Sequence, residues 1–268
     1  RWYTYKEGFS PFFFFFFIER FKTSDQNVVF DSFGGIGTTV VVSTLLGFNA
    51  FSNDVNPLSN FIAKVKAEHY NKNDLSDLEN EKKKIHNHSF QTKNKPPDNE
   101  TVSSYFSEIT LDSVLKVQAY IDTLKNEKVR NLIFIALLTI LESISTHRKD
   151  GNGVKRKKNF KGDFDLDKVT ELLINQIDLF IFDIKNSHFK NKSLIQSQSS
   201  FDEYILARKA DLVITSPPYA NCFDYSKVYL IELWFGGFFK SKVDQKNFRE
   251  SSIISHVHYK WNFRHQDF

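Results

Sequence analysis

The segment Thr215-Ser216-Pro217-Pro218-Tyr219 constrains the fold of this 268-residue chain more than any other feature. It follows the apolar run of residues 210–214, which predicts a short buried strand. Two consecutive prolines end that strand, because proline has no N–H to donate and its φ is fixed. In an open α/β sheet, ligands bind at the carboxyl ends of strands. The loop therefore suits a planar ring that bears an amine, and an ordinary turn after a strand is the alternative.

A glycine-rich turn near the start of the chain predicts a second ligand-binding segment, beside the proline-containing loop. A β-branched and aromatic run at residues 28–30 precedes residues 31–39 (DSFGGIGTT), and an apolar stretch at 40–46 follows. This order indicates a strand, a turn and a helix whose N-terminus offers free N–H groups. The glycine spacing is neither the dinucleotide-binding fingerprint nor a P-loop, and a plain tight turn is the alternative.

A second strand is expected at residues 49–53, ending at Asp54. An acidic residue about 20 residues beyond such a glycine turn is the expected partner of ribose hydroxyls. Asn56 and Pro57 then predict the N-cap and the first turn of another helix.

Together these segments resemble the amino-directed DNA methyltransferases, which transfer a methyl group from S-adenosylmethionine to an exocyclic nitrogen of a base. Residues 31–39 resemble the family's cofactor motif Asp-Pro-Phe-x-Gly-x-Gly-Thr-Thr, with Ser32 in place of the proline. Residues 5–11 resemble, more loosely, the segment that covers the methionine end of the cofactor. The resemblance implies an α/β fold, namely a Rossmann-like class I methyltransferase sheet with helices on both faces, plus a mostly helical insertion. The residues that it implies for cofactor binding are Ser10, Pro11, Asp31, Phe33, Gly34, Gly35, Gly37, Thr38, Thr39, Asp54 and Asn56.

The family's catalytic tetrapeptide implies both the reacting groups and the target base. Adenine-N6 enzymes usually carry Asp or Asn before Pro-Pro, whereas cytosine-N4 enzymes usually carry Ser, so Ser216 favours cytosine N4. The Ser216 hydroxyl and the Pro217 carbonyl are expected to accept the two amine hydrogens, with no covalent enzyme intermediate. The implied catalytic residues are Ser216, Pro217, Pro218 and Tyr219.

Several residues are expected to contact the nucleic acid. The target base must leave the duplex, and Tyr219 is expected either to stack on it or to pack in the core. Asp224 and Tyr225 are expected to line the base pocket or, alternatively, to cap an amphipathic helix predicted at residues 227–235. The basic stretch 147–161 predicts a flexible loop that is either a plain solvated surface or a contact to DNA phosphates. Its candidate contacts are Arg156, Lys157 and Lys158.

The chain between the two motifs predicts a mostly helical region. Residues 71–99 indicate a helix extension followed by a mobile linker, whereas residues 102–145 and 164–182 have helix spacing. We expect a methyltransferase domain from residues 1–70 and 200–268, and an insertion at 71–199 that includes the target-recognition region. The chain stops early for the family, which predicts a truncated sequence.

The amino-acid composition narrows the functional classes to which this protein can belong. A net charge of +4 and a pI of about 8.9 are compatible with nucleic acid. The single cysteine, Cys222, excludes an intrachain disulfide framework and suits a cytoplasmic location. No Cys/His cluster has zinc spacing, so no metal is expected. The run of six phenylalanines at residues 12–17 is too short to span a membrane and predicts a helix packed beside the cofactor site.

The leading hypothesis is a cytosine-N4 methyltransferase of a restriction–modification system, which acts on double-stranded DNA and has a cognate restriction endonuclease as a further partner. The alternatives are an adenine-N6 or RNA base-amine methyltransferase and an inactive fragment that binds nucleic acid. A nucleotide-dependent oxidoreductase is disfavoured, because the glycine spacing differs.

Overall fold

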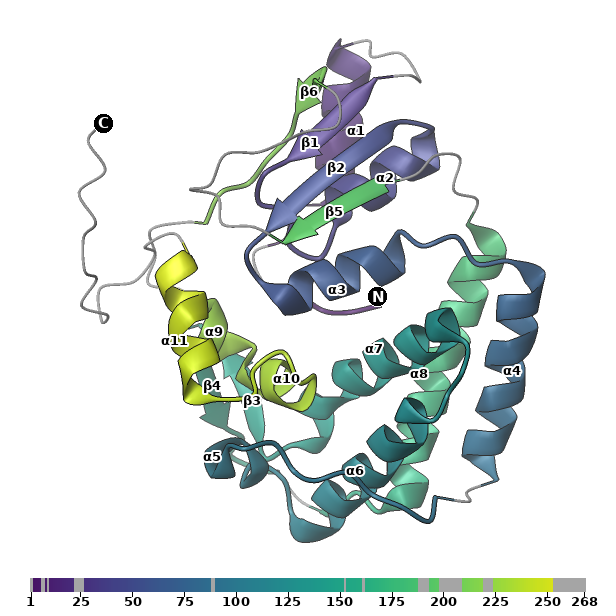
Figure 1. Ribbon diagram of the computed structural model, residues 1–268, viewed down its shortest axis with the longest axis vertical. Helices are drawn as coiled ribbons and strands as arrows, with labels where there is room; N and C mark the ends of the chain where they lie inside the picture. Colours follow the sequence, from purple (N-terminus) through teal and green to yellow (C-terminus); the bar gives the residue numbers. More distant parts are fainter. Residues whose placement is uncertain are drawn as a thin grey trace.

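The computed structural model describes residues 2–5, 8, 10–21, 27–87, 90–151, 153–160, 162–187, 193–197, 209–218 and 224–252. These residues form an α/β structure with a parallel sheet at one end and a group of helices at the other (Figure 1). Helix α3 (Pro57–Lys66) lies between the two and contacts both β2 and α7. The predicted α/β class with a mostly helical middle segment is confirmed at this level.

The sheet has the strand order β5-β2-β1-β6 among the described residues, and all its pairings are parallel. Its strands are β1 (Val28–Asp31), β2 (Asn49–Asp54), β5 (Ser193–Ser197) and β6 (Leu212–Val213). The chain leaves β1 for β2 on one side, whereas β6 pairs on the other side. The loops that follow β1 and β6 therefore leave the same edge of the sheet next to each other. The strands predicted at residues 28–30 and 49–53 are confirmed; β2 ends at Asp54 as predicted, whereas β1 extends by one residue to Asp31, which was predicted to start the turn.

Strand β6 differs from the prediction of a buried strand over residues 210–214. It has two residues, and the side chain of Val213 is 57% exposed. Within the described part of the chain β6 pairs with β1 alone, so one edge of the strand has no neighbour there. The residue after it, Ile214, is buried as expected.

Helices α1 (Pro11–Phe21) and α2 (Thr38–Leu46) pack against one face of the sheet. Their shared core consists of Phe14, Val29, Val42, Phe48 and Ile214. Side chains alternate along a strand, so Val28 and Phe30 point to the opposite face, where they meet Phe51. Helical cover of that second face stays a prediction, since its described cluster contains no helical residue.

The phenylalanine run forms a helix, as predicted, but it is mostly exposed. Phe14 is fully buried, whereas Phe12 and Phe16 are 82% and 59% exposed. A helix turns once in 3.6 residues, so consecutive phenylalanines cannot all face the sheet. Helix α1 packs on α2, the helix that follows the glycine turn.

The helical part contains the large core of the molecule. Its helices are α4 (Lys72–His86), α5 (Glu100–Ser103), α6 (Glu108–Asp122), α7 (Glu127–Ile144) and α8 (Leu166–Asn186). Their N-caps are the side chains of Asn71, Asn99, Ser107, Asn126 and Asp165. The prediction that residues 71–99 extend the preceding helix is wrong. Helix α3 ends at Lys66, and Asn71 with Asp74 forms a capping box that starts a separate helix.

The predicted flexible loop at residues 147–161 is instead a β-hairpin. Strand β3 (His147–Asp150) pairs antiparallel with β4 (Gly153–Arg156). Lys149 anchors the hairpin, because its buried ammonium forms an ion pair with the buried carboxylate of Glu232. The sequence predicts a basic loop here, because Glu232, the buried partner of Lys149, is far away in the chain and no local pattern reveals the pair.

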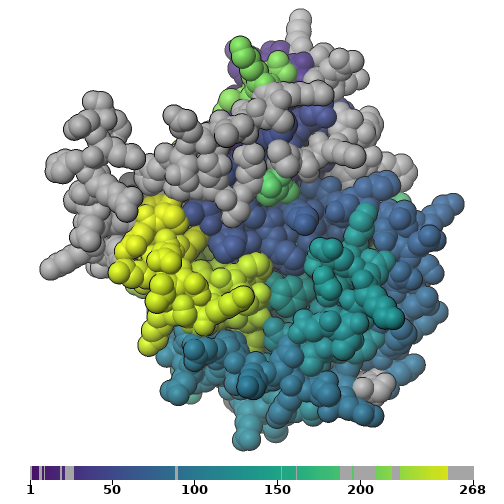
Figure 2. All heavy atoms as spheres, in the orientation of Figure 1, coloured from purple at the N-terminus to yellow at the C-terminus, as the bar shows by residue number. Residues whose placement is uncertain are grey.

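The helix predicted at residues 227–235 is also broken. Helix α9 (Tyr225–Val228) and helix α10 (Leu230–Phe235) meet at Tyr229, and α11 (Lys242–Ser251) follows. Residues 231–235 of α10 are all buried rather than amphipathic. Phe238, which follows α10, lies 5.7 Å from the ring of Phe61 in α3. Figure 2 shows this part of the chain, in yellow, lying against the blue residues of α3 and its neighbours.

Two absences hold for the part of the chain that the structure describes. No helix there is long and apolar enough to cross a membrane. Nor do three or more His, Cys, Asp or Glu side chains gather there as a metal site would require.

Candidate active site

Asp31 ends β1 and holds the glycine turn in shape. Its buried carboxylate accepts hydrogen bonds from the Phe33 N–H at 3.1 Å and from the Thr39 hydroxyl at 2.6 Å. Burial raises the pKa of the Asp31 carboxyl, whereas the Thr39 hydroxyl lowers it. Each oxygen is thus already bonded within residues 31–39, and a direct contact of Asp31 to a cofactor stays a prediction.

Glycine is required at two positions of the turn, because any larger side chain there would clash with neighbouring residues. A Cβ on Gly34 would lie 1.7 Å from the Ser52 hydroxyl oxygen on the neighbouring strand. Gly37 has φ of +80°, and a Cβ there would lie 2.7 Å from the Cβ of Ala63 in α3. Glycine at these positions lets the turn pack closely on β2 and α3. Of the other predicted cofactor residues of the turn, Phe33, Gly35 and Thr38 are half-buried.

Asp54 lies at the end of β2 and faces the glycine turn. One carboxylate oxygen accepts the Gly35 N–H at 2.9 Å, and the other accepts the Asn56 N–H at 2.7 Å. Burial raises the pKa of the Asp54 carboxyl to about 6, although these two N–H groups lower it. The structure thus joins Asp54 to the turn, and its predicted contact with the ribose hydroxyls stays a prediction.

Asn56 caps helix α3, which confirms its predicted structural role: its side-chain oxygen accepts the Leu58 N–H at 3.1 Å. Its Nδ2 is buried and has no hydrogen-bond partner among the residues that the structure describes. The same is true of Oδ1 of Asn60, whose Nδ2 donates to the Asp54 carbonyl at 2.6 Å. A buried donor and a buried acceptor without partners among the described residues therefore lie close to Asp54, where a ligand or water would satisfy them.

The proline-rich loop meets the glycine turn directly. The Ile214 N–H donates to the Phe30 carbonyl at 3.0 Å, which continues the pairing of β6 with β1. Beyond it, the hydroxyls of Thr215 and Ser32 are 3.1 Å apart and hydrogen-bonded. Ser32 is the residue that departs from the family's proline, and here its hydroxyl supplies a bond that proline lacks.

The predicted catalytic residues follow this contact. Ser216 and Pro218 are half-buried and Pro217 is exposed. These residues stand at the carboxyl edge of the sheet, beside the turn that follows β1. Tyr219 lies outside the described residues, and its stacking role stays a prediction.

A stack of tyrosines borders the glycine turn, and sequence reasoning did not find it. The ring of Tyr5 lies 4.9 Å from that of Tyr229 with nearly parallel planes, and 6.1 Å from that of Tyr225. A Cβ on Gly35 would be 3.4 Å from the Tyr5 ring. The spacing of Tyr225 and Tyr229 is a helical i, i+4 pair, a signal that they share a face. Ser10 and Pro11, from the same N-terminal segment, are exposed at the start of α1.

Asp224 takes the capping role that was the alternative to a place in the base pocket. Its carboxylate accepts the Ser226 N–H at 3.0 Å at the start of α9. Arg249 of α11 lies 3.3 Å from the other oxygen. Tyr225 is half-buried in the tyrosine stack. Contact of either residue with a base stays a prediction.

The three predicted phosphate contacts have different surroundings. Arg156 and Lys158 are exposed at the end of the hairpin. Lys157 instead donates to the carbonyls of Glu142, Ser143 and Ser145, which lie at the C-terminal end of α7. Burial also lowers the pKa of Lys157. Its ammonium thus acts as a helix cap, and a phosphate contact of all three residues stays a prediction.

Comparison with known proteins finds relatives of one kind. Type II methyltransferase M.BsoBI of Geobacillus stearothermophilus is 30% identical to the chain over 281 residues, 93% of this chain and 54% of the relative. The chain is related to the Type II methyltransferases. Proteins named Type II methyltransferase M.AvaI, from Nostoc sp. and Anabaena variabilis, are each 27% identical over 87% of this chain and 53% of theirs.

The relationship to Type II methyltransferases confirms the resemblance drawn from the two motifs. The chain spans about half the length of the curated relatives it matches. No family model and no solved structure matches it. The names of these relatives do not distinguish cytosine N4 from adenine N6.

The residues present fit S-adenosylmethionine, the cofactor that the resemblance implies. The ribose needs an acceptor for its hydroxyls, and Asp54 supplies a carboxylate beside the glycine turn. The buried, unpartnered Nδ2 of Asn56 and Oδ1 of Asn60 are a donor and an acceptor near this carboxylate. These groups match a ligand that carries both hydroxyls and a heterocyclic edge.

Proposed function

We propose that this chain carries the catalytic site of a DNA methyltransferase of a restriction–modification system, with N4 of cytosine as its target and S-adenosylmethionine as its methyl donor. The supporting observation is the hydrogen bond between Ser32 and Thr215. It joins the loop of Ser216 to the glycine turn, although the two residues are 183 positions apart. We propose further that the sheet is Rossmann-like, with a methyltransferase domain from residues 1–70 and 200–268 and an insertion at 71–199.

The cofactor side of the site rests on the residues around the glycine turn. When bound, S-adenosylmethionine supplies an electrophilic methyl group on a sulfonium. Asp54 is proposed to accept the ribose hydroxyls, and Asn56 to donate its free N–H to the ligand. The glycines contribute indirectly, because they let the turn pack closely on β2, α3 and Tyr5.

The base side of the site rests on Ser216 and Pro217. The lone pair of an exocyclic amine is delocalised into the ring, which makes the amine a poor nucleophile. Two acceptors, the Ser216 hydroxyl and the Pro217 carbonyl, hold the amine hydrogens and favour a pyramidal nitrogen that presents its lone pair. Because Pro217 and Pro218 restrict the backbone and Thr215 is bonded to Ser32, these acceptors are positioned before the base arrives.

The DNA contact is proposed to run over the basic hairpin. Strand β4 packs on α9, and a Cβ on Gly153 would be 3.4 Å from that of Lys227. Helix α9 starts at Tyr225, soon after the proline-rich loop. The exposed Arg156 and Lys158 thus belong to an element attached to the catalytic segment, where phosphate contacts hold the duplex in place.

Product analysis tests the proposal. The protein is incubated with labelled S-adenosylmethionine and unmethylated double-stranded DNA, and the DNA is digested to nucleosides. We expect labelled N4-methylcytosine, because serine stands where adenine enzymes usually carry Asp or Asn. 6-Methyladenine as the sole product contradicts the cytosine assignment, and methylated RNA alone contradicts the DNA assignment. Tight DNA binding with no methyl transfer at high protein concentration identifies an inactive fragment.

A further inference from the structure

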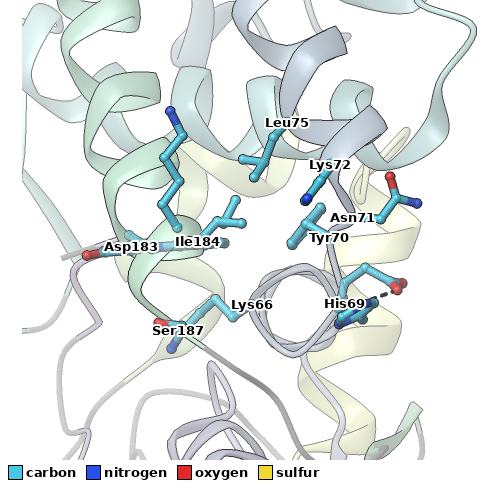
Figure 3. A pocket seen from close by; sticks show the side chains of 12 residues that line it. Lys66, His69, Tyr70, Asn71, Lys72, Leu75, Asp183, Ile184 and Ser187 are labelled. Atoms are coloured by element: carbon cyan, nitrogen blue, oxygen red, sulfur yellow. Dashed lines mark hydrogen bonds between the residues drawn. The ribbon is translucent and has the colours of Figure 1, made fainter.

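A pocket of about 720 Å³ lies outside the site described above. It opens where the end of α3 and the start of α4 face the last turns of α8 (Figure 3). Figure 3 shows Leu75 from α4 and Ile184 from α8 on either side of the same hollow, with Lys66 and Ser187 below them. The volume is within the range of small-molecule sites, roughly 300–1,000 Å³.

The charges that line this pocket leave a cationic surplus. Of its two carboxylates, Glu68 is paired with Lys128 at 3.1 Å, whereas Asp183 accepts the indole N–H of Trp2 at 2.9 Å, a neutral donor that does not offset the carboxylate. Lys66 and Lys72 have no carboxylate within 4 Å among the described residues. The pocket therefore offers two lysines against one carboxylate, Asp183, and keeps a surplus of positive charge for an anionic ligand.

Lys66 connects the pocket to the glycine turn. Its ammonium donates to the carbonyl of Ile36 at 2.9 Å. An ammonium has three N–H donors, so two remain for a ligand. Burial lowers the pKa of Lys66 to about 8, which leaves it mostly charged at neutral pH. An anion that binds this ammonium also acts on the turn that carries residues 34–37.

The lining also includes a third lysine, Lys185, which is paired with Glu79 at 2.7 Å, together with polar, apolar and aromatic side chains. The Trp2 ring is stacked on Phe180 at 4.5 Å, which holds it in place beside the pocket. Tyr70 is buried, and its hydroxyl donates to the Val65 carbonyl at 2.7 Å. Rigid aromatic side chains next to two lysines suit a ligand that combines a flat ring with a negative group.

We propose that this pocket binds a phosphate-bearing small molecule of about mononucleotide size, with its phosphate on Lys66 and Lys72. Binding there biases the glycine turn through the Lys66–Ile36 hydrogen bond, and so changes the affinity for the methyl donor. The first statement is independent of the proposed function, whereas the second rests on it.

The test uses uridine monophosphate and inorganic phosphate, because uracil has neither an adenine ring nor an exocyclic amine that would compete for the proposed active site. Binding to the whole chain is measured by calorimetry. We expect one site per chain, weakened about fivefold by Lys72→Gln, which removes one exposed cation from the pocket. Lys64→Gln, an exposed lysine of α3 outside the pocket, is the matched control and should leave the affinity unchanged.

The outcomes separate the possibilities. The proposed site is overturned if neither uridine monophosphate nor inorganic phosphate binds. It is also overturned if Lys72→Gln and Lys64→Gln weaken the binding equally. If neither probe binds but Lys72→Gln weakens duplex DNA binding, the lysine contacts the DNA backbone and the small-molecule site is again overturned. For the second statement, S-adenosylmethionine affinity is measured with and without saturating uridine monophosphate. We expect a difference that Lys66→Met abolishes, and equal affinities refute the coupling without affecting the site itself.

Discussion

The sheet part (residues 10–21, 28–66, 193–197 and 209–218) and the helical part (72–186 and 224–252) are built in opposite ways. The helical part contains most of one large apolar cluster, with fully buried side chains such as Leu132 and Ile133 in α7. The sheet part contains two small clusters and many buried polar side chains close to the glycine turn, among them Asp31, Asn56 and Asn60.

This difference separates the proposed active site from the main apolar core that stabilises the fold. Buried polar groups without partners lower stability, roughly by 1–3 kcal/mol each, so the sheet part is costly to fold alone. Helix α3 offsets this cost, because its polar start holds Asp54 while Leu58 and Ile62 enter the large cluster. The proposed site is thus supported by the helical part without being built from it.

The largest expected effect is a loss of methyl-transfer activity, caused by a substitution in the sheet part. Ser216→Ala removes a hydroxyl acceptor that positions the amine, and we expect methyl transfer to fall by roughly 10²–10³-fold with cofactor affinity retained. Single-turnover transfer and cofactor calorimetry measure the two quantities. Ser143→Ala, an exposed serine of α7, is the matched control. Near-normal transfer by Ser216→Ala would remove this residue from the mechanism.

The next effect is on stability and comes from the helical part. Leu132→Ala creates a cavity in the large cluster, and we expect the free energy of unfolding to fall by about 2–5 kcal/mol. The same change at the half-buried Leu212 of β6 should cost less than half as much, because fewer atoms surround it. Urea unfolding of both variants measures the difference. Equal losses would show that the sheet part is packed as well as the helical part.

The pH dependence of cofactor binding should follow Asp54. An ionised carboxylate is needed to accept two ribose hydroxyls, so affinity should fall as the pH drops through about 6, by up to tenfold per pH unit. Stability should change in the opposite sense. The pKa of Asp54 in the folded protein is raised above the unfolded value of about 3.9. The contribution of Asp54 to the free energy of unfolding is therefore fully present below a pH of about 3.9 and is lost as the pH rises through about 6.

Calorimetry at several pH values between 5 and 8 tests this prediction. Asp54→Asn keeps the size of the side chain and should bind the cofactor weakly, with no pH dependence in this range. A wild-type profile that Asp54→Asn preserves would assign the titration to another group.

The smallest effect concerns the contact between the two loops. Thr215→Val removes the hydrogen bond to Ser32, and we expect a loss of about 1 kcal/mol, which corresponds to roughly a fivefold slower transfer if the bond positions Ser216. Ser32→Ala should cause a similar loss, and the double variant should be no worse than either single one. Additive losses would mean that the two hydroxyls act independently.

Local sequence patterns predicted much of the sheet part. β1, β2, the glycine turn and the Asn56 cap depend on residues within a few positions of one another, so propensity and spacing were sufficient. The helices of residues 102–145 and 164–182 were also predicted, because their apolar periodicity is long. The boundaries near Lys66 and Tyr229 were missed, since a cap and a break depend on single residues.

The parts that were missed depend on distant partners. The hairpin was taken for a loop, because Lys149 looks like a solvated cation until Glu232 is placed beside it. Val213 looks like a core residue, but within the described part of the chain its strand lies at the edge of the sheet. The tyrosine stack and the pocket at Lys66 each join segments more than a hundred residues apart.

By itself, the sequence determined which groups are present for the proposed chemistry: a serine before two prolines, a glycine turn and an aspartate at a strand end. It determined them because each motif is short and its backbone needs are local. The tertiary structure alone decided that the loop of Thr215 meets Ser32, that Asp54 holds Gly35, and that Lys66 reaches Ile36. These contacts form only when parallel strands from distant parts of the chain pair side by side, and no local pattern encodes that pairing.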